Sequence, residues 1–213
     1  MVRRLVPLAK VRVGPAPADE SRPYDPTMPG TWREPHRDVK IPFEQALEEW
    51  SEVSVPILVE VAGTYGGYIT YSELASRLNR ATGIHTGQLL SNWSGKLLNR
   101  VIHLCRENGL PARSALVVHA SDGTVGKGFD EVFRASNRNV PHTEIERERA
   151  AAAERLECYR VYCSTIPADA EPQLTRQYEA RVNPRKKDTS RTNKVCPLHG
   201  IQLPATGFCD DCT

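Results

Sequence analysis

Ile69-Thr-Tyr-Ser-Glu-Leu-Ala-Ser-Arg-Leu78 is the stretch that decides the fold of the first domain. Thr70 offers the hydroxyl of a helix N-cap, and Glu73 stands three residues later, which is the spacing of a capping box. A helix therefore begins near Tyr71. After a predicted loop over residues 82–86, a longer helix over residues 88–108 has apolar residues spaced for one buried face: Leu89, Leu90, Trp93, Leu97, Val101, Leu104 and Cys105.

Two shorter helices are predicted upstream. Phe43 to Trp50 is amphipathic, and Pro56 suits the first turn of a second helix, where its missing N–H has no intrahelical partner to lose. Downstream, the Val- and Leu-rich residues 114–120 lead into Ser121-Asp-Gly123, a strong signal for a β-hairpin. Helices followed by a hairpin predict a mainly α fold with a small β-hairpin wing, a winged helix-turn-helix, over residues 43–135.

The flanking segments differ from this domain in composition. Residues 1–42 hold eight of the sixteen prolines, each of which fixes φ and removes a backbone donor. We predict a basic, Pro-rich arm that is extended or disordered, with Trp32 as a docking point. Residues 136–163 predict a charged connector helix, residues 164–195 a basic linker with a short helix, and residues 196–213 a separate unit.

Charge is concentrated at the two ends of the chain. The 213 residues have a formal net charge of only +2 at pH 7, so the total favours no class of partner. Residues 181–194, however, carry six Lys and Arg against Asp188, and the first fourteen residues carry four. Such basic ends are typical of contacts with phosphates, whose strength falls as salt rises.

The sequence predicts no membrane segment. No run approaches the roughly 18 consecutive apolar residues of a membrane-spanning helix, and the longest, Val55 to Ala62, contains Pro56 and Glu60. The N-terminus from Met1 to Pro7 lacks the apolar segment of about 7–15 residues that marks a signal peptide. We therefore predict a cytoplasmic protein without a membrane partner.

The C-terminal unit has the strongest motif in the chain. Cys196-Pro-Leu-His199 and Cys209-Asp-Asp-Cys212 are two close pairs of ligands, separated by nine residues. Two such pairs suit tetrahedral Zn²⁺, and four protein ligands leave no open position, which indicates a structural rather than a catalytic metal. A disulfide or a chance clustering is the alternative. Because so short a unit has little apolar surface, the metal would serve as its core.

Three other cysteines have different surroundings in the sequence. Cys158 and Cys163 bracket Tyr159-Arg-Val-Tyr162 and are interpreted either as buried structural thiols or as a second metal pair. Cys105 lies on the apolar face of its predicted helix, which places it in the core.

The first domain resembles a known family. Its Ile69 to Leu78, Asn99-Arg-Val-Ile102, Asn108-Gly-Leu-Pro111 and Ser121 to Phe129 are similar to motifs in the C-terminal domain of the alkylguanine-DNA alkyltransferases and the alkyltransferase-like proteins. The similarity spans about residues 54–130. It implies a winged helix-turn-helix that enters the minor groove of DNA and flips a base.

The resemblance also implies roles for single residues. Tyr71 matches the Tyr of the family's first helix, and Arg100 matches the Arg that fills the gap left by the flipped base. The family's acceptor cysteine, in P-C-H-R, has no counterpart, because this chain has Ser114-Ala-Leu-Val-Val118 there. DNA binding without alkyl transfer is therefore expected. The C-terminal unit resembles the zinc ribbons that accompany nucleic-acid-binding proteins.

These patterns together favour a non-catalytic DNA-binding protein, with DNA preferred over RNA. Two alternatives remain open: an adaptor that binds protein, in part through the Pro-rich arm, and a DNA-processing enzyme that would depend on Asp122 or His119. The sequence carries no signal for an oligomeric state. The predicted nucleic-acid contacts, for which a solvated helix face is the alternative, are Tyr71, Lys96, Asn99, Arg100, His103, Lys127, Arg185, Lys186 and Lys187.

Overall fold

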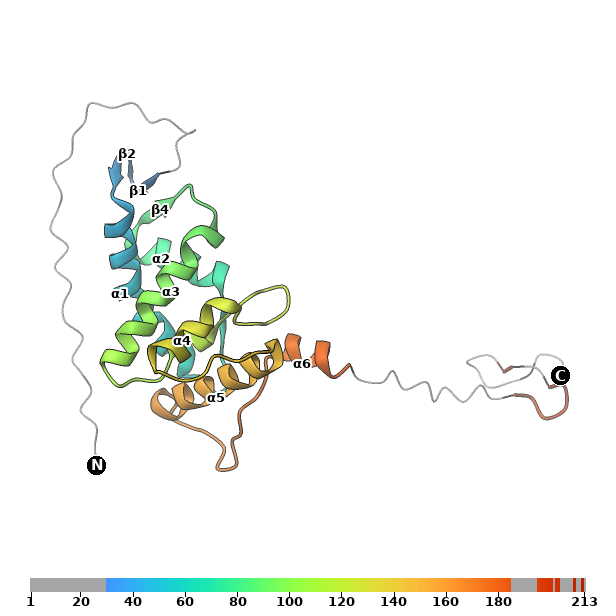
Figure 1. The fold of residues 1–213 in the computed structure, drawn as a ribbon. Helices are drawn as coiled ribbons and strands as arrows, with labels where there is room; N and C mark the ends of the chain where they lie inside the picture. Colours follow the sequence, from blue (N-terminus) through green and yellow to red (C-terminus); the bar gives the residue numbers. More distant parts are fainter. Residues whose placement is uncertain (1–29, 185–194, 201, 204–208, 210–211, 213) are drawn as a thin grey trace.

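The computed structural model describes residues 30–184, 195–200, 202–203, 209 and 212. Within them, helices dominate and the strands are short, so the predicted mainly α fold with a small β component is confirmed (Figure 1). The helices are α1 (Phe43–Ala62), α2 (Tyr71–Thr82), α3 (Leu90–Glu107), α4 (Asp130–Ala135), α5 (Glu144–Tyr162) and α6 (Arg176–Val182). The strands are β1 (Thr31–Arg33), β2 (His36–Ile41), β3 (Ile69–Thr70), β4 (Ile84–Thr86) and β5 (Val117–Val118).

Helix α1 is continuous where the sequence predicted two helices. Trp50, Ser54 and Leu58 are spaced four residues apart and are all buried, so one stripe of the helix faces the core through the whole region. Pro56 lies inside this helix on its exposed side. Because the carbonyl that Pro56 leaves without a helical donor belongs to exposed Glu52, water can reach it and the helix continues.

Helices α2 and α3 form as the sequence predicted. The Thr70 hydroxyl accepts a hydrogen bond from the Glu73 backbone N–H at 3.2 Å, which caps α2, and Gly83 ends that helix in the left-handed region with φ of 69°. Helix α3 runs through Ser94 and Gly95 without a break, and it buries Trp93, Leu97, Val101 and Cys105 in the core.

A three-stranded antiparallel sheet forms where the sequence predicted an extended arm and a loop. Strand β1 pairs with β2 on one side and β4 on the other, around a turn with a cis Glu34–Pro35 peptide bond. Arg33 fixes this sheet to the helices, because its guanidinium donates to Glu49 and to the Thr82 carbonyl at 2.7 and 2.8 Å. Trp32 stacks on His85 of β4, at 6.0 Å between ring centroids, instead of docking elsewhere.

The predicted hairpin wing is wrong. Strand β5 pairs in parallel with β3, with Val117 opposite Ile69 and both fully or almost fully buried. Residues 119–124 form a turn instead, in which the His119 N–H donates to the Thr124 carbonyl at 2.7 Å. Val125 lies outside any strand because side chains bind both of its backbone groups: Tyr71 donates to its carbonyl, and Glu148 accepts from its N–H.

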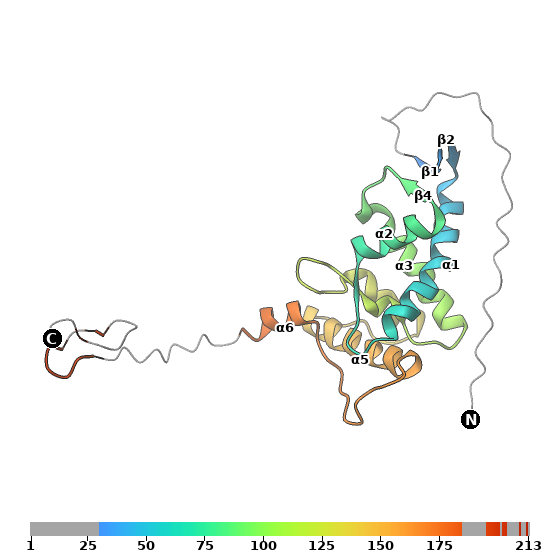
Figure 2. The same cartoon turned by 180° about the vertical axis from the view of Figure 1, so that it is seen from behind.

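Helix α5 packs into the core, which differs from its predicted role as a connector. It begins in a complete capping box between Thr143 and Glu146, and it buries small or apolar side chains such as Ala151, Ala152 and Leu156. The sheet lies near one end of α1 and α5 near the other (Figures 1 and 2). No helix in the described ranges is both long and apolar enough to cross a bilayer.

Candidate metal centre and basic surfaces

The four predicted metal ligands come together. All their ligand atoms lie within 4.8 Å of one another, so the cluster can bind a metal ion. His199 Nδ1 is 3.8 Å from the Cys196 sulfur, 3.6 Å from the Cys209 sulfur and 3.3 Å from the Cys212 sulfur. The Cys196 and Cys212 sulfurs are 3.5 Å apart. A tetrahedral zinc with bonds of about 2.3 Å to sulfur and about 2.0 Å to nitrogen separates its ligand atoms by roughly 3.5–3.8 Å, which agrees with these distances.

Local backbone turns aim the ligands. Val195 and Gln202 form an antiparallel bridge, and between them the Gly200 N–H donates to the Cys196 carbonyl at 2.9 Å. Gly200 has a φ of 68°, a conformation that side chains disfavour, and this turn brings His199 back toward Cys196. The Cys212 N–H donates to the Cys209 carbonyl at 3.1 Å, which makes a second tight turn for the other pair of ligands.

The electrostatics of the cluster favour a bound cation. Backbone N–H groups of His199 and Leu198 donate to the Cys196 sulfur and lower the pKa of this thiol to about 6, so it is a thiolate near neutral pH. Hydrogen bonding to Cys196 and the charges of the neighbouring thiolates raise the pKa of Cys212 to about 11. A divalent cation would offset this repulsion and allow all the thiols to ionise together.

The remaining cysteines lie apart from this centre. In the portions of the chain that are described, Cys196, His199, Cys209 and Cys212 form the only cluster of three or more ligands, so Cys158 and Cys163 make no second metal site there. Cys158 is buried, and burial raises its pKa to about 12. The Cys163 thiol donates to the Thr165 carbonyl at 3.2 Å. Cys105 is buried, as predicted.

The predicted nucleic-acid face of α3 is partly occupied by contacts within the protein. Arg100 forms an ion pair with Glu44 of α1 at 2.6 Å, and His103 Nε2 is 3.6 Å from a carboxylate oxygen of Glu131. Lys96 Nζ lies 5.5 Å from the ring centre of Phe43. Asn99 is exposed. The sequence shows the basic residues of this face but not the carboxylates that the fold brings beside them.

The other predicted contacts do not join that face. Tyr71 donates from its hydroxyl to the Val125 carbonyl at 2.9 Å and packs against His119, so its phenol has a structural role. Burial and the nearby charge of Glu148 raise its pKa to about 12. Lys127 is exposed beside the 119–124 turn. Arg185, Lys186 and Lys187 lie outside the described residues.

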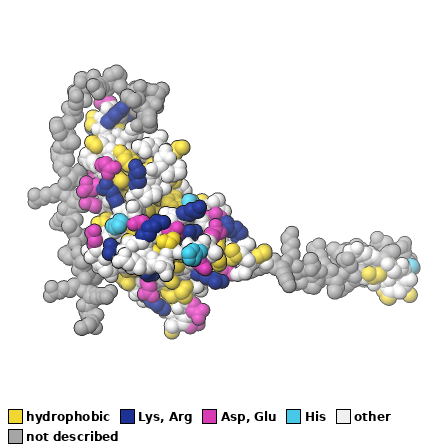
Figure 3. Space-filling model, viewed as in Figure 1, with side chains coloured by type: hydrophobic (Ala, Val, Ile, Leu, Met, Phe, Trp, Pro, Cys, Tyr) yellow, Lys and Arg dark blue, Asp and Glu magenta, His cyan; other side chains and the backbone are white. Residues whose placement is uncertain are grey.

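Basic and acidic side chains are mixed on the surface of the helical domain. Figure 3 shows Lys and Arg beside Asp and Glu over this face, rather than a continuous basic patch. Several exposed cations have carboxylate partners, among them Arg37 with Glu34 at 2.7 Å and Arg138 with Glu154 at 2.8 Å. The helical domain therefore lacks, on the face in this view, the single-sign surface that is typical of strong phosphate binding.

Sequence reasoning missed a buried group on α5. Glu148 is buried, one of its carboxylate oxygens accepts from the Val125 N–H at 3.0 Å, and the other has no partner among the described residues. Charged residues in a helix usually face solvent, so only the long-range packing of α5 reveals this position. Comparison with protein families, with curated proteins and with solved structures finds no match, so function is inferred from the geometry described above.

Proposed function

We propose that this chain is a non-catalytic nucleic-acid-binding protein, with DNA preferred over RNA. Its contact surface would be the metal-bearing C-terminal unit together with the basic segment that precedes it. The observation that carries the proposal is the convergence of four Cys and His ligands directly after residues 185–194, which contain five Lys and Arg against one Asp. A metal-fixed turn would hold this charge beside a rigid unit, an arrangement suited to gripping phosphates.

The metal in this proposal is structural zinc. Three thiols and one imidazole are the ligand set that zinc prefers, and their separations suit its tetrahedral geometry. When bound, the ion supplies a fixed cross-link between the two turns. The residues around it orient the ligands: backbone N–H groups at Leu198 and His199 hold the Cys196 thiolate, and Gly200 permits the sharp turn.

The helical domain has a supporting role in this proposal. Helices α2 and α3 would act as a helix-turn-helix pair, with Lys96, Asn99 and Lys127 as the exposed polar contacts. Arg100 and His103 contribute less, because Glu44 and Glu131 already neutralise or accept from them. We therefore expect the C-terminal segment to dominate affinity.

The test is a salt titration of the zinc-loaded full chain against labelled duplex DNA and a matched duplex RNA. Changing Arg185, Lys186 and Lys187 together to Ala should reduce the slope of log affinity against log salt by about three, since each phosphate contact contributes roughly 0.9. A matched control replaces three exposed cations of the helical domain, Lys40, Arg80 and Arg149, and should leave most of the slope unchanged.

Three outcomes would overturn the proposal. The full chain with its zinc bound does not bind either duplex, or the control variant loses as much of the slope as the test variant. Tighter binding to RNA than to DNA at every salt concentration would reverse the stated preference. Each outcome is read on protein whose metal content has been measured, so that an unfolded C-terminal unit is not mistaken for weak binding.

One observation favours a second candidate, a protein-binding adaptor. Leu198, between two metal ligands, is 80% exposed, and neighbouring Val195 is 51% exposed. Apolar side chains on a rigid, exposed turn are typical of protein contacts. A Leu198→Asp chain that keeps its metal and its DNA affinity, but loses a protein that crosslinks to the unmodified chain, would identify this function.

A further inference from the structure

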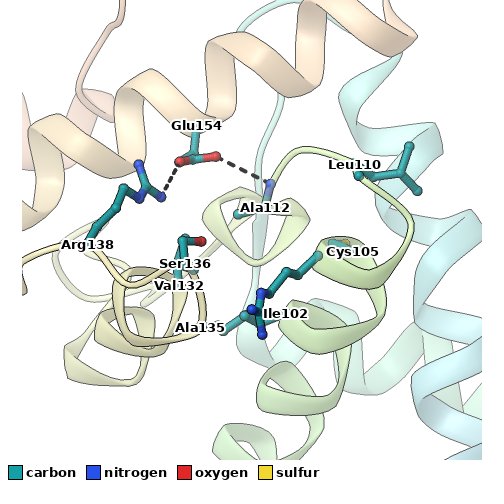
Figure 4. A pocket seen from close by; sticks show the side chains of 11 residues that line it. Ile102, Cys105, Leu110, Ala112, Val132, Ala135, Ser136, Arg138 and Glu154 are labelled. Atoms are coloured by element: carbon teal, nitrogen blue, oxygen red, sulfur yellow. Dashed lines mark hydrogen bonds and ion pairs between the residues drawn. The ribbon is translucent and has the colours of Figure 1, made fainter.

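A pocket opens between the C-terminal end of α3, α4 and α5, away from the metal ligands in the sequence. Its volume is about 240 Å³, and Figure 4 shows α5 above it with Glu154 pointing toward Arg138 and Ala112. Neither the sequence motifs nor the proposed nucleic-acid function uses this pocket. Its lining residues are Ile102, Cys105, Arg106, Gly109, Leu110, Ala112, Val132, Ala135, Ser136, Arg138 and Glu154.

The floor of the pocket is apolar and well packed. Ile102, Cys105 and Val132 are each at most 4% exposed, and Ala112 and Ala135 are also buried. These side chains belong to one of the two buried apolar clusters or border it, so the floor is held by the core rather than by a surface loop. A cavity of roughly 150 Å³ lined by apolar groups accepts benzene, so this volume accommodates a phenyl ring or a branched alkyl chain.

The rim of the pocket is polar and carries an excess positive charge. Arg138 is held in place, because it donates to Glu154 at 2.8 Å and its guanidinium lies 4.9 Å from the centre of the Phe133 ring. Glu154 also accepts from the Ala112 N–H, at the long distance of 3.4 Å. Arg106 is exposed and forms no ion pair with any residue in the described ranges. Since Glu154 neutralises Arg138, the charge of Arg106 is left over.

We propose that this pocket binds a small carboxylic acid with an apolar body. The body would lie on the floor formed by Ile102, Val132 and Ala135, and the carboxylate would pair with Arg106 at the rim. An amine would meet the unpaired guanidinium with like charge, and a neutral molecule would leave it without a partner. The carboxylate is therefore the ligand group that complements both the floor and the rim. This site is independent of the proposed nucleic-acid function.

Calorimetric titration of the full, zinc-loaded chain tests the proposal with two probes, 3-phenylpropionate and its neutral amide. The acid should bind about tenfold more tightly than the amide, because only the acid makes a charge-assisted contact with Arg106. Arg106→Ala should remove this preference and leave amide binding nearly unchanged. Arg134→Ala is the matched control: Arg134 is an exposed cation on α4 that pairs with Glu131 and does not line the pocket.

A second variant tests the floor. Ala135→Leu fills the cavity and should weaken both probes about tenfold, while amide NMR shifts at Gly109 and Ala112 locate the site in the unmodified chain. The proposal is overturned if neither probe binds at millimolar concentration, or if acid and amide bind equally. It is also overturned if Arg106→Ala and Arg134→Ala have the same effect, or if the shifts fall elsewhere. Because Arg106 is exposed, its variant keeps the test decisive even if Ala135→Leu unfolds the domain.

Discussion

The helical domain and the C-terminal unit are stabilised in different ways. In the helical domain, Trp50 is fully buried and stacks on Trp93 at 4.6 Å between ring centroids, within a large apolar cluster. Among the described residues of the C-terminal unit, only Cys196 and Cys209 are buried, while Leu198 is open to solvent. Burial of apolar area maintains the first region, and ligand convergence the second. The same chain therefore has two regions that should respond to different perturbations.

Removal of the metal should produce the largest difference between the regions. Chelation, or Cys209→Ser, is expected to unfold residues 195–212 completely, because no apolar core replaces the ion there. The thermal transition of the helical domain should be unchanged. Near-neutral NMR spectra of the full chain, with and without chelator, would show collapse of the Gly200 and Gln202 signals alone. Loss of the Trp50 and Trp93 signals in the same titration would contradict the separation of the two regions.

Trp50→Ala is the converse change. Truncating a buried aromatic side chain costs about 3–5 kcal/mol, so the helical domain should become marginal or unfold. Metal affinity should stay within about twofold of the unmodified chain, measured by competition with a chromophoric chelator. Val161→Ala, at an exposed position of α5, is the control and should change neither quantity. A large drop in metal affinity with Trp50→Ala would show that the regions are coupled.

The two regions should also respond to pH in opposite directions. Burial raises the pKa of Tyr71 and Tyr159 to about 12, so both phenols stay neutral in the folded domain while the unfolded chain ionises near 10. Their contribution is fully present below pH 10 and is lost as pH rises toward 12, by about 2–3 kcal/mol for each tyrosine. The metal unit should instead fail in acid, as protons compete for its thiolates.

Urea unfolding at pH 9, 10 and 11 measures the alkaline effect. Tyr71→Phe should flatten the loss of stability between pH 10 and 11, because phenylalanine has no proton to release, although it also removes the hydrogen bond to Val125. Metal retention measured from pH 7 down to pH 4 gives the other half of the comparison. An unchanged alkaline slope in Tyr71→Phe would show that this phenol does not contribute.

Thr143→Ala is expected to have the smallest effect. It removes the N-cap of α5, whose hydroxyl accepts from the Glu146 N–H at 3.3 Å, and caps of this kind contribute about 1 kcal/mol. The free energy of unfolding of the helical domain should fall by that amount, with metal affinity unchanged. Ser121→Ala, at an exposed position, serves as the control. A loss as large as that of Trp50→Ala would mean that the N-terminus of α5 holds more of the domain than its contacts indicate.

Sequence reasoning succeeds where a feature is encoded locally. The cap of α2 is contained in Thr70 and Glu73, and the four metal ligands are marked by residue type and spacing, so both could be predicted. It fails where a distant partner decides the outcome. Val117 and Val118 form a strand with residues almost fifty positions earlier, which no local pattern shows. Likewise, Glu44 and Glu131 reach α3 only through the fold, so the pairing of Arg100 and His103 could not be predicted.

The parallel pairing of β3 with β5 has a consequence for folding kinetics. These two-residue strands enclose residues 71–116, which contain α2, β4 and α3, so they meet only after a long loop has closed. Loop closure costs entropy before the contact is gained, and contacts distant in sequence slow folding. The helices inside the loop can form from local contacts and shorten it. We therefore expect the joining of the two shortest strands, rather than the formation of any helix, to set the folding rate of the domain.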